Sequence, residues 1–286
     1  MMNIKENEIA TLVNSVLEDY QEYPVLLDKE LESNIAYLKT LRESYIRTVQ
    51  DIVEITQSSS RQNLKILEIG SFYGLVSICL SQLGYQVTAT DIPDFIFNDS
   101  LQKKLSKNNI SSFGCDLSQL EFPCKTEEFD IVIMCEVLEH LNFNPLPLIK
   151  EINRIVKPNG LFYLSLPNIT SLKNRIRLLT GHSIHNPIEH YIWQLNPEST
   201  MKIGIHWREY TTNEIREMLD LLGFYVDKQY YFDWFDQVSV FQRTSMISMI
   251  KFLLKKVVYK IFPSLKENQT TLARKVKDVK NLFINF

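Results

Sequence analysis

Hydrophobic residues in the first sixty positions recur at spacings of three and four. The series runs through Leu31, Ile35, Leu38, Leu41, Tyr45, Val49 and Ile52. This spacing places the side chains on one face of a helix. The pattern therefore predicts a long helix, preceded by a shorter one that Pro24 separates from it.

The pattern changes after position 60, where short apolar runs alternate with segments of helix length. Strands are predicted at 64–69, 86–91, 110–115, 129–135 and 161–166, and helices at 74–83, 98–107 and 145–156. Strands that alternate with helices of about ten residues form a parallel sheet with helices on both faces. The predicted fold class is therefore α/β, with a doubly wound sheet.

Three glycines are predicted to adopt the left-handed conformation that ends a helix. Gly84, Gly160 and Gly223 each lie between a predicted helix and the next predicted strand. Glycine adopts this conformation without a steric penalty. Gly70 and Gly74 lie in the opposite connection, from strand to helix, where ligands bind in such sheets.

The regular alternation stops between residues 167 and 210. This segment contains one predicted helix, at 171–180, and four of the five histidines: His182, His185, His190 and His206. We expect it to form a cap over the ligand site and to contribute a binding pocket there. Beyond it, the pattern predicts a helix at 211–222, a strand at 224–232, a helix at 245–262 and a last strand at 270–277.

Residues 1–60 lie outside the sheet pattern and precede the domain of residues 61–286. We expect them to be a lid over the ligand site, because closure of such a site excludes water from it. Four tyrosines in this segment favour a lid: Tyr20, Tyr23, Tyr37 and Tyr45. A cover for one sheet face and a dimer contact are the alternatives.

The charge of the chain is unevenly distributed. Of the 286 residues, 45% are hydrophobic and 23% charged, with a net charge of -3. Residues 243–286 carry ten Lys and Arg against two acidic residues, whereas the preceding residues carry 21 basic and 32 acidic groups. We therefore expect no nucleic-acid binding, and any anionic partner would meet the basic tail.

Helix 245–262 of this tail is both basic and apolar. Such a helix either lies on an anionic membrane or a partner, or packs on its own sheet while its Lys side chains reach solvent. No apolar run predicts a membrane span, and the N-terminus lacks the apolar core of a signal peptide. The four cysteines form no C-x-x-C pair, which predicts reduced thiols and a cytoplasmic location.

The first strand-to-helix loop contains Glu68, Gly70 and Gly74. The glycines allow a sharp turn and the close approach of a ligand. The carboxylate of Glu68 would repel a pyrophosphate but suits an ammonium group. The dinucleotide pattern G-x-G-x-x-G is also absent, since Phe72 and Leu75 stand at two of its positions. A nicotinamide-linked oxidoreductase is therefore a disfavoured alternative.

Two later loops contribute acidic residues. Asp91 lies 21 residues after Gly70, where a carboxylate accepts hydrogen bonds from both hydroxyls of a ribose. Asp116 would accept from an exocyclic amine such as that of adenine, while Leu117 covers the ring. An ammonium, a ribose and an adenine without phosphate describe S-adenosylmethionine. The alternative for both aspartates is that they cap their own loops.

The sequence resembles the class I S-adenosylmethionine-dependent methyltransferases between residues 64 and 167. Five motifs carry the resemblance: LEIGSFYG, VTATD, GCDL, FDIVIMCEVLEHL and PNGLFYLSLPN. Phe72 departs from the first motif, which has a glycine there. The resemblance implies a Rossmann-like sheet, mostly parallel with an antiparallel last strand. It also implies a set of cofactor-binding residues: Glu68, Gly70, Gly74, Asp91, Asp116, Leu117 and Glu136.

Glu136 and His140 follow the strongest predicted strand. We expect Glu136 to face the cofactor or the acceptor, and His140 to be the general base for a hydroxyl or a structural cap. Glu136-x-x-Glu139-His140 also resembles the metal-binding loop of ubiquinone-pathway O-methyltransferases and small-RNA 2′-O-methyltransferases. A fourth ligand would come from the cap. We expect no metal requirement, and metal-assisted transfer is the alternative.

The segment from His206 to Tyr210 resembles the stretch before the late helix of small-molecule methyltransferases. His206, Arg208 and Tyr210 are therefore the predicted acceptor-binding residues. We expect transfer of a methyl group from S-adenosylmethionine to a hydroxyl of a small molecule, sugar or lipid precursor. A non-catalytic S-adenosylmethionine-binding protein is an alternative, and the sequence leaves N-methylation and the oligomeric state open.

Overall fold

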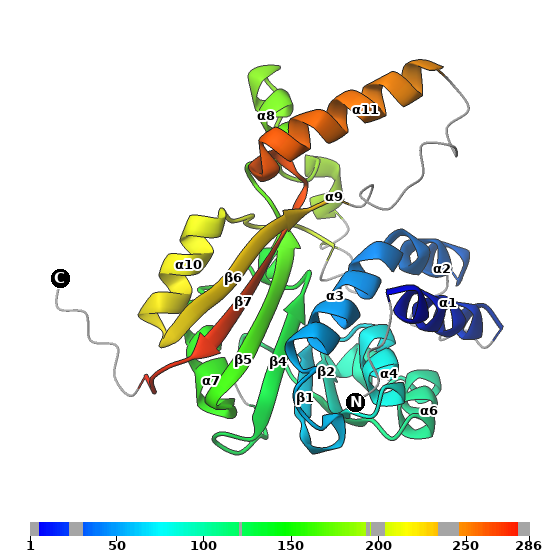
Figure 1. Cartoon of the computed structure of the whole chain (residues 1–286), viewed down its shortest axis with the longest axis vertical. Helices are drawn as coiled ribbons and strands as arrows, with labels where there is room; N and C mark the ends of the chain where they lie inside the picture. The colour runs from blue at the N-terminus through cyan, green and yellow to red at the C-terminus, as the bar shows by residue number, and fades with distance from the viewer. Residues whose placement is uncertain are drawn as a thin grey trace.

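The computed structural model of the protein describes residues 6–22, 31–119, 122–192, 195, 204–233 and 246–279. Its strands form one seven-stranded sheet in the order β3-β2-β1-β4-β5-β7-β6 (Figure 1). They are β1 (Lys65–Ile69), β2 (Gln86–Asp91), β3 (Ser111–Gly114), β4 (Phe129–Cys135), β5 (Val156–Pro167), β6 (Phe224–Phe232) and β7 (Asn268–Lys275). The first five strands are parallel, and β7 lies antiparallel between β5 and β6. The mixed α/β fold with an antiparallel last strand is confirmed.

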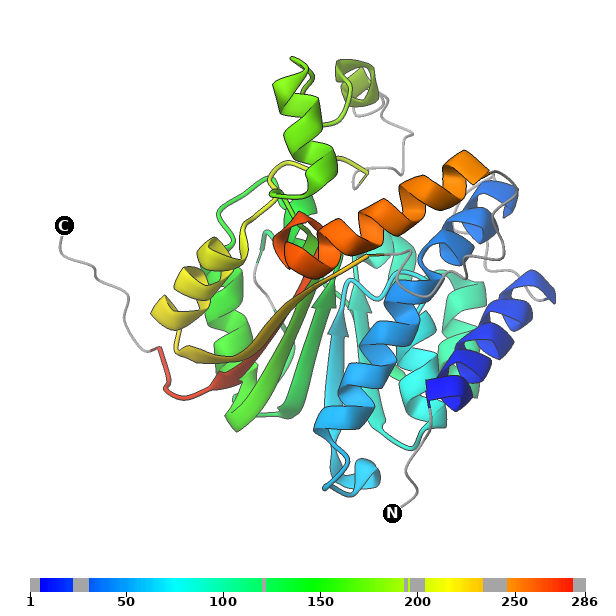
Figure 2. The same ribbon diagram turned by 45° about the horizontal axis from the view of Figure 1, so that its top comes forward.

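Helices cover both faces of this sheet (Figures 1 and 2). One face is covered by α1 (Glu6–Glu22), α2 (Leu31–Thr40), α3 (Arg42–Ile55), α4 (Leu75–Gln82), α5 (Pro93–Ile96) and α6 (Asp99–Lys107). The other is covered by α7 (Leu146–Ile155) and α10 (Thr212–Leu221). Successive strand residues point to opposite faces, so Ile66 joins the first core cluster and Leu67 the second.

The N-terminal helices are part of the first core cluster. The predicted long helix is divided at Leu41 into α2 and α3. In α3, Ile46 and Ile52 are fully buried. Asp51 accepts a hydrogen bond from the Tyr163 hydroxyl of β5 at 2.8 Å. This packing supports the sheet cover among the alternatives for residues 1–60.

The predicted glycine cap after α7 is wrong. β5 begins at Val156, directly after α7, so no left-handed residue separates the two elements. Asn159 has the positive φ, 62°, and Gly160 does not. Gly160 is needed for space instead, because a Cβ there would lie 2.8 Å from the Lys157 carbonyl oxygen. Gly84 and Gly223 have φ values of 94° and 81°, as predicted.

The cap between β5 and α10 contains α8 (Leu172–Leu179) and α9 (Ile188–Ile192). Its residues 193–194 and 196–203 lie outside the described part of the chain. Both helices project beyond the carboxyl ends of the parallel strands (Figure 2). Thr211 and Glu214 form a capping box at the start of α10, so the predicted helix start is confirmed.

Helix α11 (Met246–Ile261) leads through the short turn η5 (Pro263–Leu265) into β7. Phe252 and Tyr259 are buried, but most of the described apolar side chains of this helix are exposed. Packing of the apolar face on the sheet was one of the two possibilities for this helix, and the structure does not show it. None of the described helices is long and apolar enough to cross a membrane.

Candidate active site

Gly70 and Gly74 shape the turn from β1 into α4. Both have a left-handed φ of 71°. A Cβ on Gly70 would lie 2.2 Å from Val137 Cγ2, so the loop after β4 packs directly against the Gly70 backbone. Conformation and space both require glycine at position 70.

Phe72 stands where the motif has a glycine, and its φ of 49° is also left-handed. Its backbone N–H donates to Asp91 Oδ2 at 2.6 Å. Its ring meets Tyr37 of α2 edge-on, with the ring centroids 5.9 Å apart, and Phe95 at 5.7 Å. The departure from the motif thus brings an aromatic cluster to the β1–α4 loop.

The first and second predicted loops meet at Asp91. Besides the bond from Phe72, Asp91 Oδ1 accepts from the Ile92 N–H at 2.7 Å. Burial raises the pKa of Asp91 to about 6. Asp116 is exposed, and its Oδ1 accepts from the Ser118 N–H at 2.9 Å. Its contacts are those of a loop cap, whereas Asp91 joins two loops.

Glu68 lies beneath the β1–α4 turn and is buried. Its Oε2 accepts hydrogen bonds from the backbone N–H of Ser77, at 2.9 Å, and from the Ser77 hydroxyl. Burial raises its pKa to about 7, and the charge of Asp91 acts in the same direction. The carboxyl group is therefore held against the first turns of α4.

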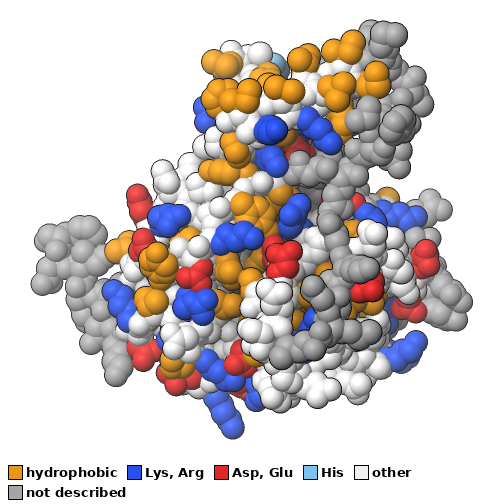
Figure 3. All heavy atoms as spheres, viewed as in Figure 1, with side chains coloured by type: hydrophobic (Ala, Val, Ile, Leu, Met, Phe, Trp, Pro, Cys, Tyr) orange, Lys and Arg blue, Asp and Glu red, His pale blue; other side chains and the backbone are white. Residues whose placement is uncertain are grey.

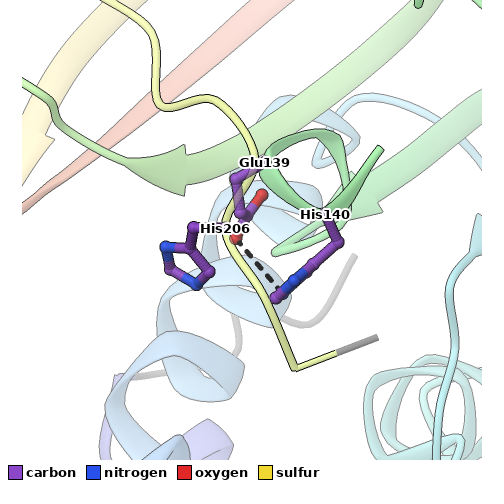
Figure 4. Close-up of side chains that lie close together, drawn as sticks. All are labelled: Glu139, His140 and His206. Atoms are coloured by element: carbon purple, nitrogen blue, oxygen red, sulfur yellow. Dashed lines mark ion pairs between the residues drawn. The ribbon is translucent and has the colours of Figure 1, made fainter. Parts of the chain in front are cut away.

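A carboxylate and two imidazoles converge beyond the end of β4 (Figure 4). Glu139 and His140 come from the turn η2 (Leu138–His140), and His206 comes from the cap. One ligand atom from each of the three lies within 4.8 Å of the others. Trp207 donates its backbone N–H to the Glu139 carbonyl oxygen at 2.8 Å, which fixes this part of the cap on η2.

Both histidines of this cluster are oriented through Nδ1. Nδ1 of His140 lies 3.0 Å from the Ile205 carbonyl oxygen, and Nδ1 of His206 lies 3.2 Å from Glu209 Oε1. This leaves both Nε2 atoms available, and that of His140 lies 3.9 Å from Glu139 Oε1. Histidines that bind a metal through one ring nitrogen usually donate a hydrogen bond from the other to a carbonyl or carboxylate oxygen.

The carboxylates of the cluster are unusually placed. Glu139 is fully buried, and neither of its carboxylate oxygens has a hydrogen-bond donor among the described residues. The same holds for Oε1 of Glu136, whose φ of 53° is left-handed. Burial raises the pKa of both groups, and the charge of Glu136 raises that of Glu139 further. Burial lowers the pKa of His140 to about 4, and His206 contributes to this.

Comparison with known proteins identifies the family. Residues 37–229 match the family described as a methyltransferase domain. The chain belongs to this methyltransferase family. Its cofactor is S-adenosylmethionine, and the nicotinamide-linked alternative is thereby excluded.

Individual relatives are more distant from this methyltransferase. The ubiquinone biosynthesis O-methyltransferase of Haemophilus ducreyi is 25% identical over 196 residues, which cover 64% of this chain and 76% of that protein. The enzyme of the same name from Rickettsia akari is 31% identical over 142 residues, covering 49% of this chain and 55% of that protein. The magnesium protoporphyrin IX methyltransferase of Synechocystis, solved with bound SAH, has the same fold: TM-score 0.51, 17% identity, 95% of this chain and 100% of that chain.

Of the three predicted acceptor residues of this methyltransferase, only His206 reaches the cluster. Arg208 donates to Glu214 Oε1 at 2.7 Å, and its guanidinium lies over the Tyr210 ring at 4.8 Å. Tyr210 is buried, and its carbonyl oxygen accepts a hydrogen bond from Gln269 of β7. Arg208 and Tyr210 therefore contact the start of α10 and the sheet.

Two contributors were missed by sequence reasoning. Glu209 orients His206 and also accepts from the Asn174 side chain at 2.9 Å. Its position three residues after a histidine was the available signal. Tyr37 was assigned only to a lid. Burial raises its pKa to about 12, and the nearby charges of Glu136 and Glu139 add to the rise.

Proposed function

We propose that this methyltransferase transfers the methyl group of S-adenosylmethionine to a hydroxyl of a small molecule, sugar or lipid precursor. The cluster of Glu139, His140 and His206 carries the proposal. A hydroxyl must lose its proton as its oxygen attacks the methyl carbon, and this cluster offers proton acceptors and metal ligands together. Relatives named as O-methyltransferases support the same acceptor atom.

The cofactor would lie over the loops after β1, β2 and β3. The assigned set is Glu68, Gly70, Gly74, Asp91, Asp116, Leu117 and Glu136. Asp91 has further lone pairs besides the two that accept backbone N–H groups, so it can also accept from ribose hydroxyls. Gly70 packs on Val137, next to Glu136, which would bring the methionine end of the cofactor toward the cluster.

The reaction breaks the bond between sulfur and the methyl carbon and forms an oxygen–carbon bond. The sulfonium becomes a neutral thioether, and the hydroxyl proton leaves. Positioning of the two reacting atoms supplies much of the acceleration in such a displacement. His140 is the proposed base, but a pKa of about 4 makes it a weak one at neutral pH.

That low basicity favours a second form of the proposal, in which Glu136, Glu139, His140 and His206 hold a divalent cation. The residues fit one, because the buried carboxylate of Glu139, which has no hydrogen-bond donor among the described residues, lies beside two imidazoles whose Nδ1 atoms are already engaged. When bound, such an ion supplies a Lewis acid that lowers the pKa of a hydroxyl. Glu209 and the Ile205 carbonyl would keep both rings in a ligating orientation.

The experiment that separates the two forms is calorimetric titration of chelator-treated protein with Mg²⁺ or Mn²⁺, beside turnover of S-adenosylmethionine with hydroxylated acceptors. For the metal form, His206→Ala should weaken ion binding by about 100-fold or more. His185→Ala is the matched control, because His185 is an exposed histidine of the same cap.

Turnover that persists in chelator, with no heat of ion binding, would contradict the metal form and leave His140 as the base. Methylation of amines but of no hydroxylated acceptor would contradict the proposed function itself. We also propose a cytoplasmic location.

A further inference from the structure

Helix α11 turns an apolar stripe away from the protein. Its positions 250, 253, 254, 257 and 261 recur at spacings of three and four, which places them on one side. These five aliphatic side chains are between 44% and 62% exposed: Ile250, Leu253, Leu254, Val257 and Ile261. The buried Phe252 and Tyr259 lie on the opposite side. The amphipathic helix is thus inverted relative to one that packs on its own core.

The cap presents a second exposed apolar region. Ile176, Leu178 and Leu179 of α8 are exposed, as are Ile188 and Ile192 of α9. Leu179 and Ile188 reach 86% and 82%, values of side chains that stand alone in solvent. We name these exposed side chains of α8, α9 and α11 the apical surface.

The two regions lie at one end of the molecule. Asn168, at the base of α8, donates to the carbonyl oxygens of Ser264 and Lys266, just after α11, at 2.8 Å each. Figures 1 and 2 show α8, α9 and α11 beyond the same ends of the parallel strands. In Figure 3 hydrophobic side chains gather over this end, with Lys and Arg beside them.

Basic residues border the apical surface. Lys173, Arg175 and Arg177 of α8 and Lys256 and Lys260 of α11 are exposed, and neither helix contains an acidic residue. This contrasts with the acidic charge of residues 1–242. Lys255 instead pairs with Asp233 and Glu267, at 3.0 and 3.2 Å, and so attaches α11 to the body.

We propose that the apical surface binds the face of an anionic lipid bilayer. Aliphatic side chains would enter the boundary of the acyl region while Lys and Arg meet the headgroups. Single aliphatic side chains that protrude from three separate helices suit a fluid layer, because each can enter it separately. Helices of this length and polarity would lie in the plane of the interface.

The inference rests on the proposed function in one respect, the choice of a lipid-precursor acceptor. The cap that carries α8 and α9 also supplies His206 to the cluster. A lipid-embedded acceptor would therefore meet the cluster on the side of the protein that rests on the membrane.

The test is co-sedimentation of the full chain with vesicles of phosphatidylcholine mixed with phosphatidylglycerol, and with vesicles of phosphatidylcholine alone. We expect binding to the mixed vesicles at least about tenfold tighter than to the neutral ones, and weaker at high salt. The double variant Leu254→Glu/Val257→Glu should reduce binding by about tenfold or more. Leu221→Glu is the matched control, since Leu221 is 54% exposed on α10, away from this end; it should leave binding unchanged.

Absence of binding to the mixed vesicles, or unchanged binding of the folded double variant, would overturn the inference. A dimer in light scattering that the double variant dissociates, without vesicle binding, would also overturn it, in favour of a contact between two copies. Vesicle binding is read without methyl transfer. A protein that methylates hydroxyl groups but does not bind vesicles refutes only this inference. A protein that binds vesicles but does not methylate hydroxyl groups refutes only the proposed function.

Discussion

Two residues other than glycine adopt left-handed backbone conformations at the edge of the proposed site, Phe72 and Glu136. A side chain in this conformation costs about 1–2 kcal/mol. Neighbouring contacts hold each in place: Phe72 donates to Asp91, and Glu136 donates its N–H to the Ser165 carbonyl oxygen at 2.8 Å. Such strain gathers at functional sites, which agrees with the roles proposed for these loops.

Gly70→Ala is expected to lower the free energy of unfolding by about 3 kcal/mol. An alanine in the left-handed conformation costs about 1–2 kcal/mol, and overpacking of its Cβ against Val137 adds about 1–3 kcal/mol. Gly84→Ala is the matched control, because Gly84 is also left-handed but has open space where its Cβ would lie. It should cost only about 1 kcal/mol. Urea denaturation measures both. Adding Val137→Ala to Gly70→Ala should recover the difference, and no recovery would show that the contact does not matter.

Single residues of the cap were the hardest to place from sequence. His206 and Arg208 are two positions apart in one motif-like segment, yet only His206 reaches Glu139 and His140. The direction of each side chain depends on what lies beside the backbone. Here Glu214 of the capping box attracts Arg208, and Glu209 orients His206. A sequence pattern lists the residue types but does not contain those neighbours.

At the scale of the element, helix and strand types were well predicted, but the partners of amphipathic helices were not. Val49 and Ile52 were correctly placed on one face of a helix, α3, and both are buried. The same pattern fits a lid and a sheet cover, because it shows that a face is apolar and not what covers it. For α11 the apolar face proved to be the exposed one.

Substitutions on α3 test whether this helix belongs to the core. Ile52→Ala should lower the free energy of unfolding by about 2–5 kcal/mol, since the side chain is fully buried in the first core cluster. Glu54→Ala, on the exposed side of the same helix, should change it by less than about 0.5 kcal/mol. Thermal unfolding followed by circular dichroism compares the two. An Ile52→Ala protein that unfolds like the wild type would favour the lid.

At the scale of the whole molecule, the alternation of strands and helices predicted the parallel part of the sheet. The place of β7 could not be predicted from that alternation, because it depends on long-range pairing. β7 (Asn268–Lys275) pairs with β5, more than a hundred residues earlier in the chain, and with β6, about forty residues earlier. Its antiparallel direction followed from the resemblance to a family. The convergence of His206 on Glu139 is a contact of the same long-range kind.

The buried carboxyl groups at the carboxyl ends of the strands make the stability of the molecule depend on pH, and Glu68 gives the clearest test. Burial raises its folded-state pKa from 4.5 to about 7. The folded state therefore binds this proton more tightly than the unfolded state does. The stabilisation that results is fully present below pH 4.5 and is lost as pH rises toward 7, so the free energy of unfolding falls across this range. The loss amounts to about 3 kcal/mol.

Glu68→Gln cannot ionise, so its stability relative to wild type should rise by that amount across the window and stay level above it. Ser77→Ala removes a hydroxyl that lowers this pKa and should shift the window upward. Urea denaturation at several pH values measures all three proteins, and parallel curves for wild type and Glu68→Gln would show that Glu68 does not titrate in this range.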